Sequence, residues 1–366
     1  MDSQNLIGQP LDAVDTPALL VDLDALEHNL ATMAAFFAAR PAVLRPHFKT
    51  HKCLEIARLQ LAAGARGVTC AKLGEVEVLV QAGIDDILLA NQIVGALKIE
   101  RLMALAARAR VTVAVDDAAN VQALAAAART AGVHLSVLVE VDLGMHRCGV
   151  APGQSALALA REVASTRALH LAGLMGYEGH LVLTKDPSER RAKVEAAFAL
   201  LLETRDLLER EGLDVEVISG GGTGTYDITG AYPGVTEVQA GSYVFMDRTY
   251  AAVRPEFRRA LSILSTVISR PSADRLVLDA GLKAVSGEFG PPEAPELAGH
   301  EEIRLSEEHA RVTLSAPERV DLRPGDRVAL TPSHCCTTVN LHDRLVAVRR
   351  GVVEAVWSVA ARGRST

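Results

Sequence analysis

Strand-like runs and helical patterns alternate eight times along the first two-thirds of the chain, and this alternation constrains the fold most strongly. The predicted strands are short runs of β-branched and aliphatic residues: 43–48, 67–71, 86–90, 111–115, 135–141, 169–176, 214–219 and 236–240. Amphipathic stretches between them predict helices: 54–63, 75–82, 97–109, 120–131, 155–164 and 190–211. Eight such units match a closed (β/α)8 barrel of the TIM type, and an open doubly wound sheet is the alternative.

The pattern changes after Met246, where helical periodicity nearly vanishes. Strand-like runs continue at 261–268, 275–278, 311–314, 327–330, 345–348 and 352–356. Gly287–Leu305 is rich in Pro, Glu and Gly and predicts a surface loop. We therefore expect an α/β barrel over residues 25–250 and a smaller, mostly β domain over 251–366. A strand at Thr16–Leu23 is expected to bring residues 1–24 to the β domain.

Composition excludes several classes of protein. The net charge is −7 and the basic residues are scattered, which argues against a nucleic-acid partner. No apolar stretch approaches the ~20 residues of a membrane helix, and no secretory signal follows Met1. Five cysteines at irregular spacing argue against a disulfide framework. We expect a cytoplasmic enzyme without a membrane partner.

A basic octapeptide, Arg45–Lys52, ends the first predicted strand and contains Lys49, Lys52, His47 and His51. Neighbouring cations and burial can lower the pKa of a lysine ammonium and leave a nucleophilic amine. Such an amine is what a Schiff base with a carbonyl compound requires. A solvated basic turn is the alternative.

Two loops follow the seventh and eighth predicted strands, where barrels commonly bind phosphate. The first is Ser219–Thr225, with consecutive glycines whose N–H groups can approach an anion, and the second is Gln239–Tyr243. The first loop lacks the Gly-Lys-Ser/Thr of a P-loop. A glycine-rich turn without a ligand is the alternative.

Three further side chains follow strands five and six of the predicted barrel. Arg147 can offer a planar fork to a phenolate or carboxylate, or can simply pair with Asp142. Tyr177 can stack on a planar cofactor, and His180 can act as an acid or base near neutral pH. A lone histidine is, however, more often structural.

A possible metal pair lies in Pro332–Thr338, after the strand expected at 327–330. In an extended chain His334 and Cys336 converge on one ion while Cys335 faces away. An imidazole and a thiolate suit zinc, with the remaining positions left to water and substrate. Buried cysteines beside a surface histidine are the alternative.

Taken in order, these motifs resemble the fold-type III pyridoxal-phosphate (PLP) enzymes, in the D-threonine aldolase and D-serine dehydratase group related to alanine racemase. The resemblance covers roughly Thr16 to Arg362. It is most specific at five segments: Pro46–Lys52, Ser219–Thr225, Gln239–Asp247, Asp279–Lys283 and Pro332–Cys336.

The resemblance implies roles for these residues. Lys49 would be the Schiff-base lysine, Arg147 would lie beside the pyridoxal ring, and Tyr177 would line the site. The cofactor phosphate would be held by the two loops, through Ser219, Gly221, Gly222, Thr223, Gly241, Ser242 and Tyr243. His334 and Cys336 would bind a divalent metal (Zn, Mn or Mg) that touches the substrate hydroxyl. The family also implies a homodimer.

Two departures bear on the reaction. The metal pair here is His-x-Cys, which is typical of the dehydratases, whereas the aldolases carry His-x-Asp. His180 lies three residues after Tyr177, where the aldolases have a histidine about six residues on. Against this, Ser219–Thr225 and Gln239–Asp247 look closer to the aldolases.

The hypothesis that follows is a PLP- and metal-dependent lyase of the D-threonine aldolase type. It would cleave small D-3-hydroxy amino acids to glycine and an aldehyde, with His180 or His51 as the base. The alternative is a D-serine, D-threonine or 3-hydroxyaspartate dehydratase that gives a 2-oxo acid and ammonia. An amino-acid racemase and a non-catalytic PLP-binding protein are further alternatives.

Overall fold

The computed structural model describes residues 3–297 and 300–366, and the chain divides into two compact units. The barrel unit comprises Met33–Lys49, Ile56–Gly241 and Gly363–Thr366. The β unit comprises Met1–Thr32, Thr50–Glu55 and Ser242–Arg362. Each unit is therefore assembled from segments far apart in the sequence.

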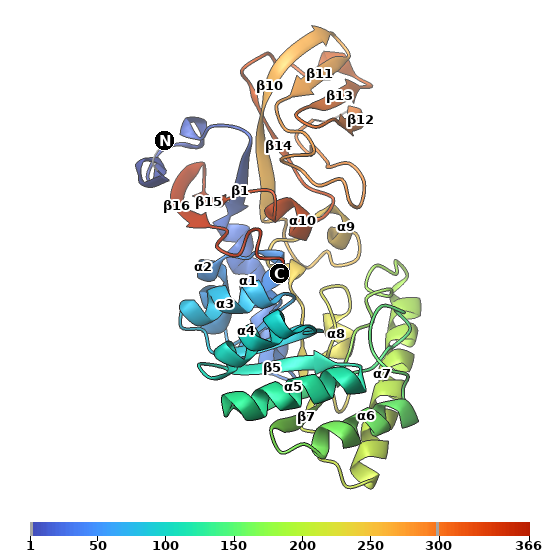
Figure 1. Cartoon of the computed structure of the whole chain (residues 1–366). Helices are drawn as coiled ribbons and strands as arrows, with labels where there is room; N and C mark the ends of the chain where they lie inside the picture. Colours follow the sequence, from blue (N-terminus) through green and yellow to red (C-terminus); the bar gives the residue numbers. More distant parts are fainter. Residues whose placement is uncertain (1–2, 298–299) are drawn as a thin grey trace. The chain divides into compact units, whose positions relative to one another are not determined.

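The barrel unit is built on an 8-stranded parallel sheet with the order β2-β9-β8-β7-β6-β5-β4-β3. Figure 1 labels two of its strands, β5 and β7. The strands are β2 (Val43–Leu44), β3 (Val68–Cys70), β4 (Asp86–Gln92), β5 (Arg110–Val115), β6 (Leu135–Glu140), β7 (Leu169–Gly176), β8 (Val217–Gly220) and β9 (Glu237–Val238). A parallel bridge between His47 and Thr69 joins the two ends of this order. The predicted barrel is confirmed, and the open-sheet alternative is wrong.

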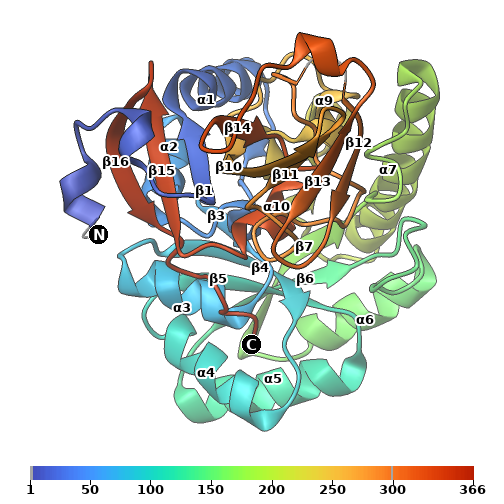
Figure 2. The same ribbon diagram turned by 90° about the horizontal axis from the view of Figure 1, so that it is seen from above.

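Helices follow the strands as predicted and lie around the outside of the sheet, as α3 to α6 do in Figure 2. They are α2 (Leu54–Ala62), α3 (Leu73–Gln81), α4 (Ala96–Ala106), α5 (Ala118–Ala131), α6 (Gln154–Ala164), α7 (Pro187–Arg210) and the short α8 (Tyr226–Thr229). Local signals fix their ends: the Asp117 side chain accepts a hydrogen bond from Asn120 N at the start of α5, and Gly132 ends it at φ 67°.

The barrel strands are apolar on both faces, because helices cover one face and the barrel interior the other. Val137, Leu138 and Val139 of β6 are all at most 1% exposed. One interior cluster brings together side chains of neighbouring strands: Leu88, Ala114, Leu138, Ala172 and Met175. This packing gives a rigid frame whose strand ends carry the polar residues of the site.

The β unit contains a second 8-stranded sheet with the order β12-β13-β11-β10-β1-β15-β16, in which β14 also pairs with β10. The strands are β1 (Ala18–Asp22), β10 (Leu261–Ser272), β11 (Arg275–Leu278), β12 (His300–Leu305), β13 (Ala310–Leu314), β14 (Arg327–Leu330), β15 (Arg344–Arg349) and β16 (Val352–Ser358). The strand expected at Thr16–Leu23 forms as β1, antiparallel to β10 and parallel to β15.

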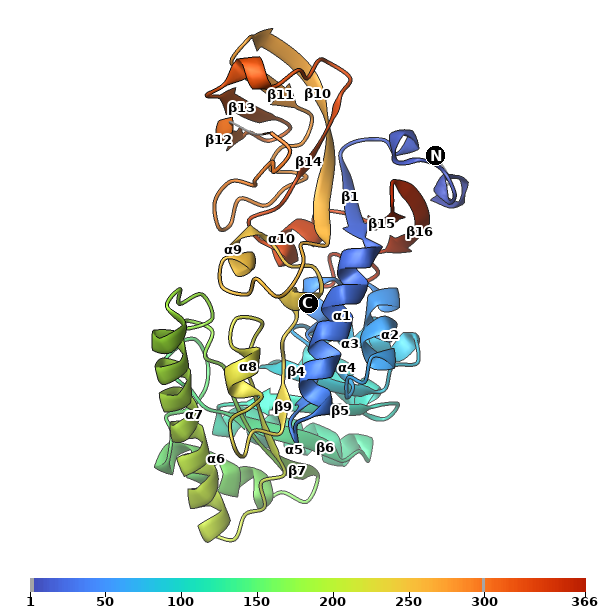
Figure 3. The same cartoon turned by 180° about the vertical axis from the view of Figure 1, so that it is seen from behind.

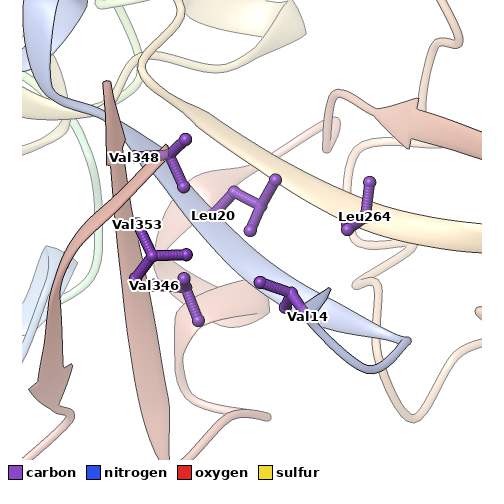
Figure 4. Packing of buried hydrophobic residues seen from close by; sticks show 6 residues of the cluster. All are labelled: Val14, Leu20, Leu264, Val346, Val348 and Val353. Carbon is purple, nitrogen blue, oxygen red and sulfur yellow. The ribbon is translucent and has the colours of Figure 1, made fainter. Parts of the chain in front are cut away.

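An aliphatic cluster holds the β1 side of this sheet together. Figure 4 shows Val14, Leu20, Leu264, Val346, Val348 and Val353, from β1, β10, β15, β16 and the segment before β1. All six are at most 9% exposed. The N-terminal segment is thereby anchored on strands more than 200 residues away, since Leu20 lies opposite Ser262.

The remaining elements are short, apart from α1 (Leu23–Ala38), which continues directly from β1 (Figure 3). They are α9 (Arg248–Ala251), α10 (Cys335–Val339) and five 3-10 turns: Ser3–Leu6, Leu11–Ala13, Phe48–Thr50, Ser242–Val244 and Pro317–Arg319. Within residues 3–297 and 300–366, no helix has the length and apolar content needed to cross a membrane.

Two expectations need correction. The surface loop predicted at Gly287–Leu305 is partly wrong, because β12 forms at its end and pairs antiparallel with β13; positions 298–299 of that loop lie outside the described residues. The strand predicted at 43–48 is shorter than expected: β2 covers only Val43–Leu44, His47 forms an isolated bridge, and a 3-10 helix begins at Phe48. Lys49 lies in this 3-10 helix, in the segment that follows β2.

Candidate active site

Of the two lysines in the basic octapeptide, only Lys49 has an uncommitted amine. Lys49 lies in the turn after β2 and is partly exposed. Its Nζ forms no hydrogen bond or ion pair with any residue of the described ranges. Lys52 instead donates a 2.7 Å hydrogen bond from Nζ to Asn340 Oδ1, from a backbone at φ 50°. Lys49 is thus the amine available to a ligand.

Arg147 and Tyr177 come together in the barrel unit, with the guanidinium carbon 5.6 Å from the centre of the tyrosine ring. Asp142, the alternative partner of Arg147, accepts instead from His146 through Nδ1 (3.0 Å) and the backbone N–H (3.0 Å). These carboxylate contacts hold the pKa of Asp142 below its usual value despite the opposing effect of burial. The arginine remains near the ring, where a planar ligand could contact it.

Glycines border the Tyr177 ring. A Cβ added to Gly179 would lie 2.4 Å from Tyr177 Cε1, and one added to Gly222 would lie 3.2 Å from the Tyr177 hydroxyl. Side chains at these positions would therefore collide with the ring or fill the space beside it. The first predicted phosphate loop and the predicted ring-lining tyrosine are in contact.

The fully buried side chain of Glu178 forms hydrogen bonds with the loop Ser219–Thr225. Its carboxylate accepts from Gly221 N (3.2 Å), Thr225 Oγ1 (2.5 Å) and Thr229 Oγ1 (2.8 Å). Burial raises the pKa of Glu178, and these hydrogen bonds oppose the rise only in part. Gly221 has φ 76°, a conformation that favours glycine. One buried acidic side chain thus binds both Gly221 and Thr225 of the loop.

The other predicted phosphate-loop residues are largely buried. Ser219 accepts a 2.8 Å hydrogen bond from Gln239 Nε2, which ties the two loops together. Thr223 is 2% exposed, and Gly241 is buried. In the β unit, Ser242 begins a 3-10 turn and the Tyr243 ring packs 5.8 Å from Phe257. Tyr243 therefore contributes a buried ring and a loop backbone.

The predicted metal segment is extended only at His334, because α10 begins at Cys335. Successive side chains point to opposite sides of a strand, about 180° apart, but are only about 100° apart around a helix. The Cys335 side chain therefore does not point fully away from its neighbours. One donor atom each from His334, Cys335 and Cys336 lies within 4.8 Å of the others. The expectation that Cys335 faces away is wrong.

His334 and Cys336 nevertheless differ from Cys335 in their surroundings. Burial raises the pKa of the Cys335 thiol well above its ordinary value, so it stays protonated. His334 Nδ1 lies 3.0 Å from Asp247 Oδ2, which leaves Nε2 for another partner. Burial would lower the pKa of His334, but Asp247 and Cys336 outweigh it and raise the pKa to about 10.

The Cys336 thiol contacts two hydroxyl groups of the β unit. It donates a 3.4 Å hydrogen bond to Thr50 Oγ1, and Ser242 Oγ lies 3.7 Å from the sulfur. Imidazole nitrogen and thiolate sulfur together suit a borderline-soft divalent ion such as zinc. The donor chemistry of His334 and Cys336 thus fits a metal.

The two candidate bases have opposite environments. His51 is fully buried, its Nδ1 accepts a 3.2 Å hydrogen bond from Cys53 N, and its ring meets Phe245 edge-on at 6.4 Å. His180 is exposed, and its ring would lie 3.5 Å from a Cβ added to Gly144. An exposed imidazole can exchange protons with solvent, which favours His180.

Glu178 and Asp247 were assigned no role from the sequence. Each is a carboxylate that is 0% exposed and follows a buried apolar run, Leu174–Gly176 and Val244–Met246 respectively. A buried acid needs several donors, so such a residue signals a polar network. In the sequence this shows only as an acid close after an apolar run, which does not identify the partners of that acid.

Two protein-family models together match most of the chain. The model of the alanine racemase N-terminal domain matches residues 21–249, and that of a putative serine dehydratase domain matches 260–348. The chain is 42% identical over 363 residues to a D-threonine aldolase of Arthrobacter sp., covering 98% of this chain and 95% of that protein.

Solved structures agree. A D-threonine aldolase from Filomicrobium marinum matches with a TM-score of 0.97 at 40% identity, covering 100% of both chains. A cysteine-to-alanine variant of a D-threo-3-hydroxyaspartate dehydratase, in the metal-free form, matches with a TM-score of 0.85 at 29% identity, covering 96% of this chain and 98% of that one. The chain therefore belongs to the alanine racemase-like, fold-type III family of PLP-dependent lyases that includes these aldolases and dehydratases.

Proposed function

We propose that this protein cleaves small D-3-hydroxy amino acids between Cα and Cβ, giving glycine and an aldehyde, with PLP and a divalent metal. The observation that carries the proposal is the histidine–thiol pair at His334 and Cys336; the available amine of Lys49, in the barrel unit, supports it. Full-length similarity to D-threonine aldolases at 40–42% identity supports the aldolase over the dehydratase reaction.

Most of the groups that PLP requires belong to the barrel unit, and Ser242 and Tyr243 belong to the β unit. Lys49 would bind its aldehyde, the loops at Gly221–Thr223 and Gly241–Tyr243 would hold its phosphate, and Arg147 with Tyr177 would border its ring. The glycines beside Tyr177 support this fit, because a Cβ there would fill the space. When bound, PLP supplies an electron sink for the pair released at the substrate Cα.

His334 Nε2 and Cys336 Sγ would hold the metal, for which we propose Zn, Mn or Mg. When bound, a divalent metal lowers the pKa of a hydroxyl group that binds it. Two protein ligands leave positions for substrate and water. We further propose that the barrel domain spans residues 25–250, that the β domain with the metal pair spans 251–366, and that the chain forms a homodimer.

His180 would accept the proton of the substrate β-hydroxyl. The oxygen then forms a carbonyl with Cβ, the Cα–Cβ bond breaks, and its electron pair stays with the glycine fragment. Cα takes up one proton, so the products balance the substrate. His51 is the less suitable base, because its ring is fully buried and Nδ1 is bound to Cys53 N.

Dehydration is the second candidate, and the cysteine in the His-x-Cys pair favours it. In that reaction the Lys49 amine would remove the α-proton and the β-hydroxyl would leave as water. The resulting enamine becomes an imine, and addition of one water releases ammonia and leaves a 2-oxo acid.

D-Threonine distinguishes the two reactions. Acetaldehyde and glycine are expected, whereas 2-oxobutanoate and ammonia would support dehydration. Turnover of D-serine alone, to pyruvate, would rule out the aldolase proposal. Racemisation that persists after EDTA treatment would instead point to a racemase.

A further inference from the structure

We infer that Asp247 is a positioning residue for the metal pair and fixes the His334 tautomer that presents Nε2. The inference rests on the proposed function, since it assumes that His334 binds metal. Asp247 Oδ2 lies 3.0 Å from His334 Nδ1. An imidazole that binds a metal through Nε2 has lost the proton on that nitrogen and carries one N–H, and a carboxylate at Nδ1 keeps that N–H there and leaves Nε2 for the metal.

The carboxylate of Asp247 cannot easily reorient. It is 0% exposed, and two backbone N–H groups hold it: Tyr250 N donates to Oδ1 (2.8 Å) and Cys335 N donates to Oδ2 (3.0 Å). Asp247 is also the N-cap of α9. The orientation of the acceptor at Nδ1 is therefore set by the backbone of two separate segments.

The same carboxylate contacts His334 and the residue before Cys336. Cys335 N belongs to the first turn of α10, which also carries Cys336. One Asp247 oxygen thus orients the His334 ring and anchors the start of the helix that places the thiol. The His334 ring lies 4.7 Å from Phe289 and 6.2 Å from Tyr250, which restricts its tilt but cannot choose its tautomer.

Asp247→Asn is the direct test. An amide has one acceptor oxygen, so it cannot serve His334, Cys335 and Tyr250 together with the geometry of a carboxylate. Loss of such a partner typically weakens metal binding by about 10–100-fold. Cobalt titration of the full-length, PLP-loaded protein measures this, because the cobalt–thiolate charge-transfer band reports Cys336 directly.

Asp279→Asn is the matched control in the same unit. Its carboxylate also accepts three hydrogen bonds, from Thr16 Oγ1 (2.5 Å), Ser265 Oγ (2.8 Å) and Thr266 N (2.8 Å), and none of these donors is a proposed ligand. We expect this variant to bind cobalt as the wild-type protein does. We expect Asp247→Asn to reach the same thiolate band only at about 10–100-fold more cobalt.

Wild-type affinity in Asp247→Asn would overturn the inference and leave the proposed function standing. Absence of the band in the wild-type protein would overturn the metal site itself, and the inference with it. If Asp247→Asn does not fold, Asp247→Ser replaces it, because serine still caps a helix. The same 10–100-fold loss is expected, and wild-type affinity would again contradict the role.

Discussion

Thr50 Oγ1 accepts a hydrogen bond from Cys336 Sγ at 3.4 Å, and Thr50 is the residue that follows Lys49 in the chain. The same sulfur lies 3.7 Å from Ser242 Oγ, next to Gly241 of the second proposed phosphate loop. The proposed metal-binding thiol thus contacts the residue that follows Lys49 and a member of the second proposed phosphate loop. A change at Cys336 is expected to affect cofactor and metal together.

Replacing each cysteine separately tests which thiol binds metal. Cys336→Ala should lose most bound metal and most lyase activity, because it removes one of two protein ligands. Cys335→Ala should retain metal, since that thiol is fully buried and its pKa is raised well above the ordinary value. Metal content after dialysis provides the measurement. Metal loss from Cys335→Ala, with retention in Cys336→Ala, would reverse the assignment.

Lys49→Ala should abolish the long-wavelength absorbance of bound PLP, together with activity, because it removes the available amine. Lys52→Gln is the matched control: it removes the other ammonium but keeps a donor for Asn340. This control should retain the absorbance band. An unchanged spectrum in Lys49→Ala would exclude Lys49 from the mechanism.

Arg45 should be important for barrel stability. Its guanidinium pairs with Glu237 of β9 (2.8 Å) and Asp86 of β4 (2.7 Å), and the Arg45 and Glu237 side chains are only 10% and 6% exposed. Arg45→Met leaves Glu237 buried without its partner and should cost about 3–5 kcal/mol of unfolding free energy.

Arg110→Ala is the control for Arg45, because Arg110 also pairs with Asp86 but its side chain is 78% exposed. Exposed pairs contribute about 1 kcal/mol or less. Denaturant unfolding of both variants gives the comparison. If both variants lose the same unfolding free energy, burial of the Arg45 ion pairs adds nothing to their contribution to stability.

Glu178 should make stability depend on pH. Its pKa is raised in the folded protein, so the folded state binds a proton more tightly than the unfolded state. The stabilisation by the protonated form is complete below the unfolded value near 4.5 and is lost as pH rises through the folded pKa. Relative to Glu178→Gln, the wild-type protein should therefore be most stable at acid pH.

Melting temperatures of the apo forms of wild-type and Glu178→Gln protein, measured from pH 4 upward, test this. As pH rises, the melting temperature of the wild-type protein should fall relative to that of Glu178→Gln. A difference that moves the other way would show that the hydrogen bonds from Gly221, Thr225 and Thr229 outweigh burial.

The sequence predicted the barrel well because its strands are buried on both faces. The apolar run Leu135–Glu140 predicts a strand without reference to any other part of the chain. β12 was missed because His300–Leu305 is mostly polar and is an edge strand whose pairing with β13 decides its structure. α1 was missed because apolar residues occupy most of Leu23–Ala38 and obscure the helical period.

The sequence is enough to propose a site residue where one side chain carries the proposed chemistry, as at Lys49, His334 and Cys336. Asp247 was not, because it lies 87 residues from His334 in sequence and only folding brings the two together. The turn at Cys335 was also missed, since nothing local distinguishes the start of a five-residue helix from continued strand.

The products formed from D-threonine test the central claim most directly. Proton NMR of one reaction mixture can quantify glycine, acetaldehyde and 2-oxobutanoate together, with L-threonine as the matched control substrate. Carbon–carbon cleavage predicts glycine and acetaldehyde in equal amounts from the D isomer, and loss of both after EDTA treatment. 2-Oxobutanoate as the main product, without glycine, would contradict the aldolase assignment.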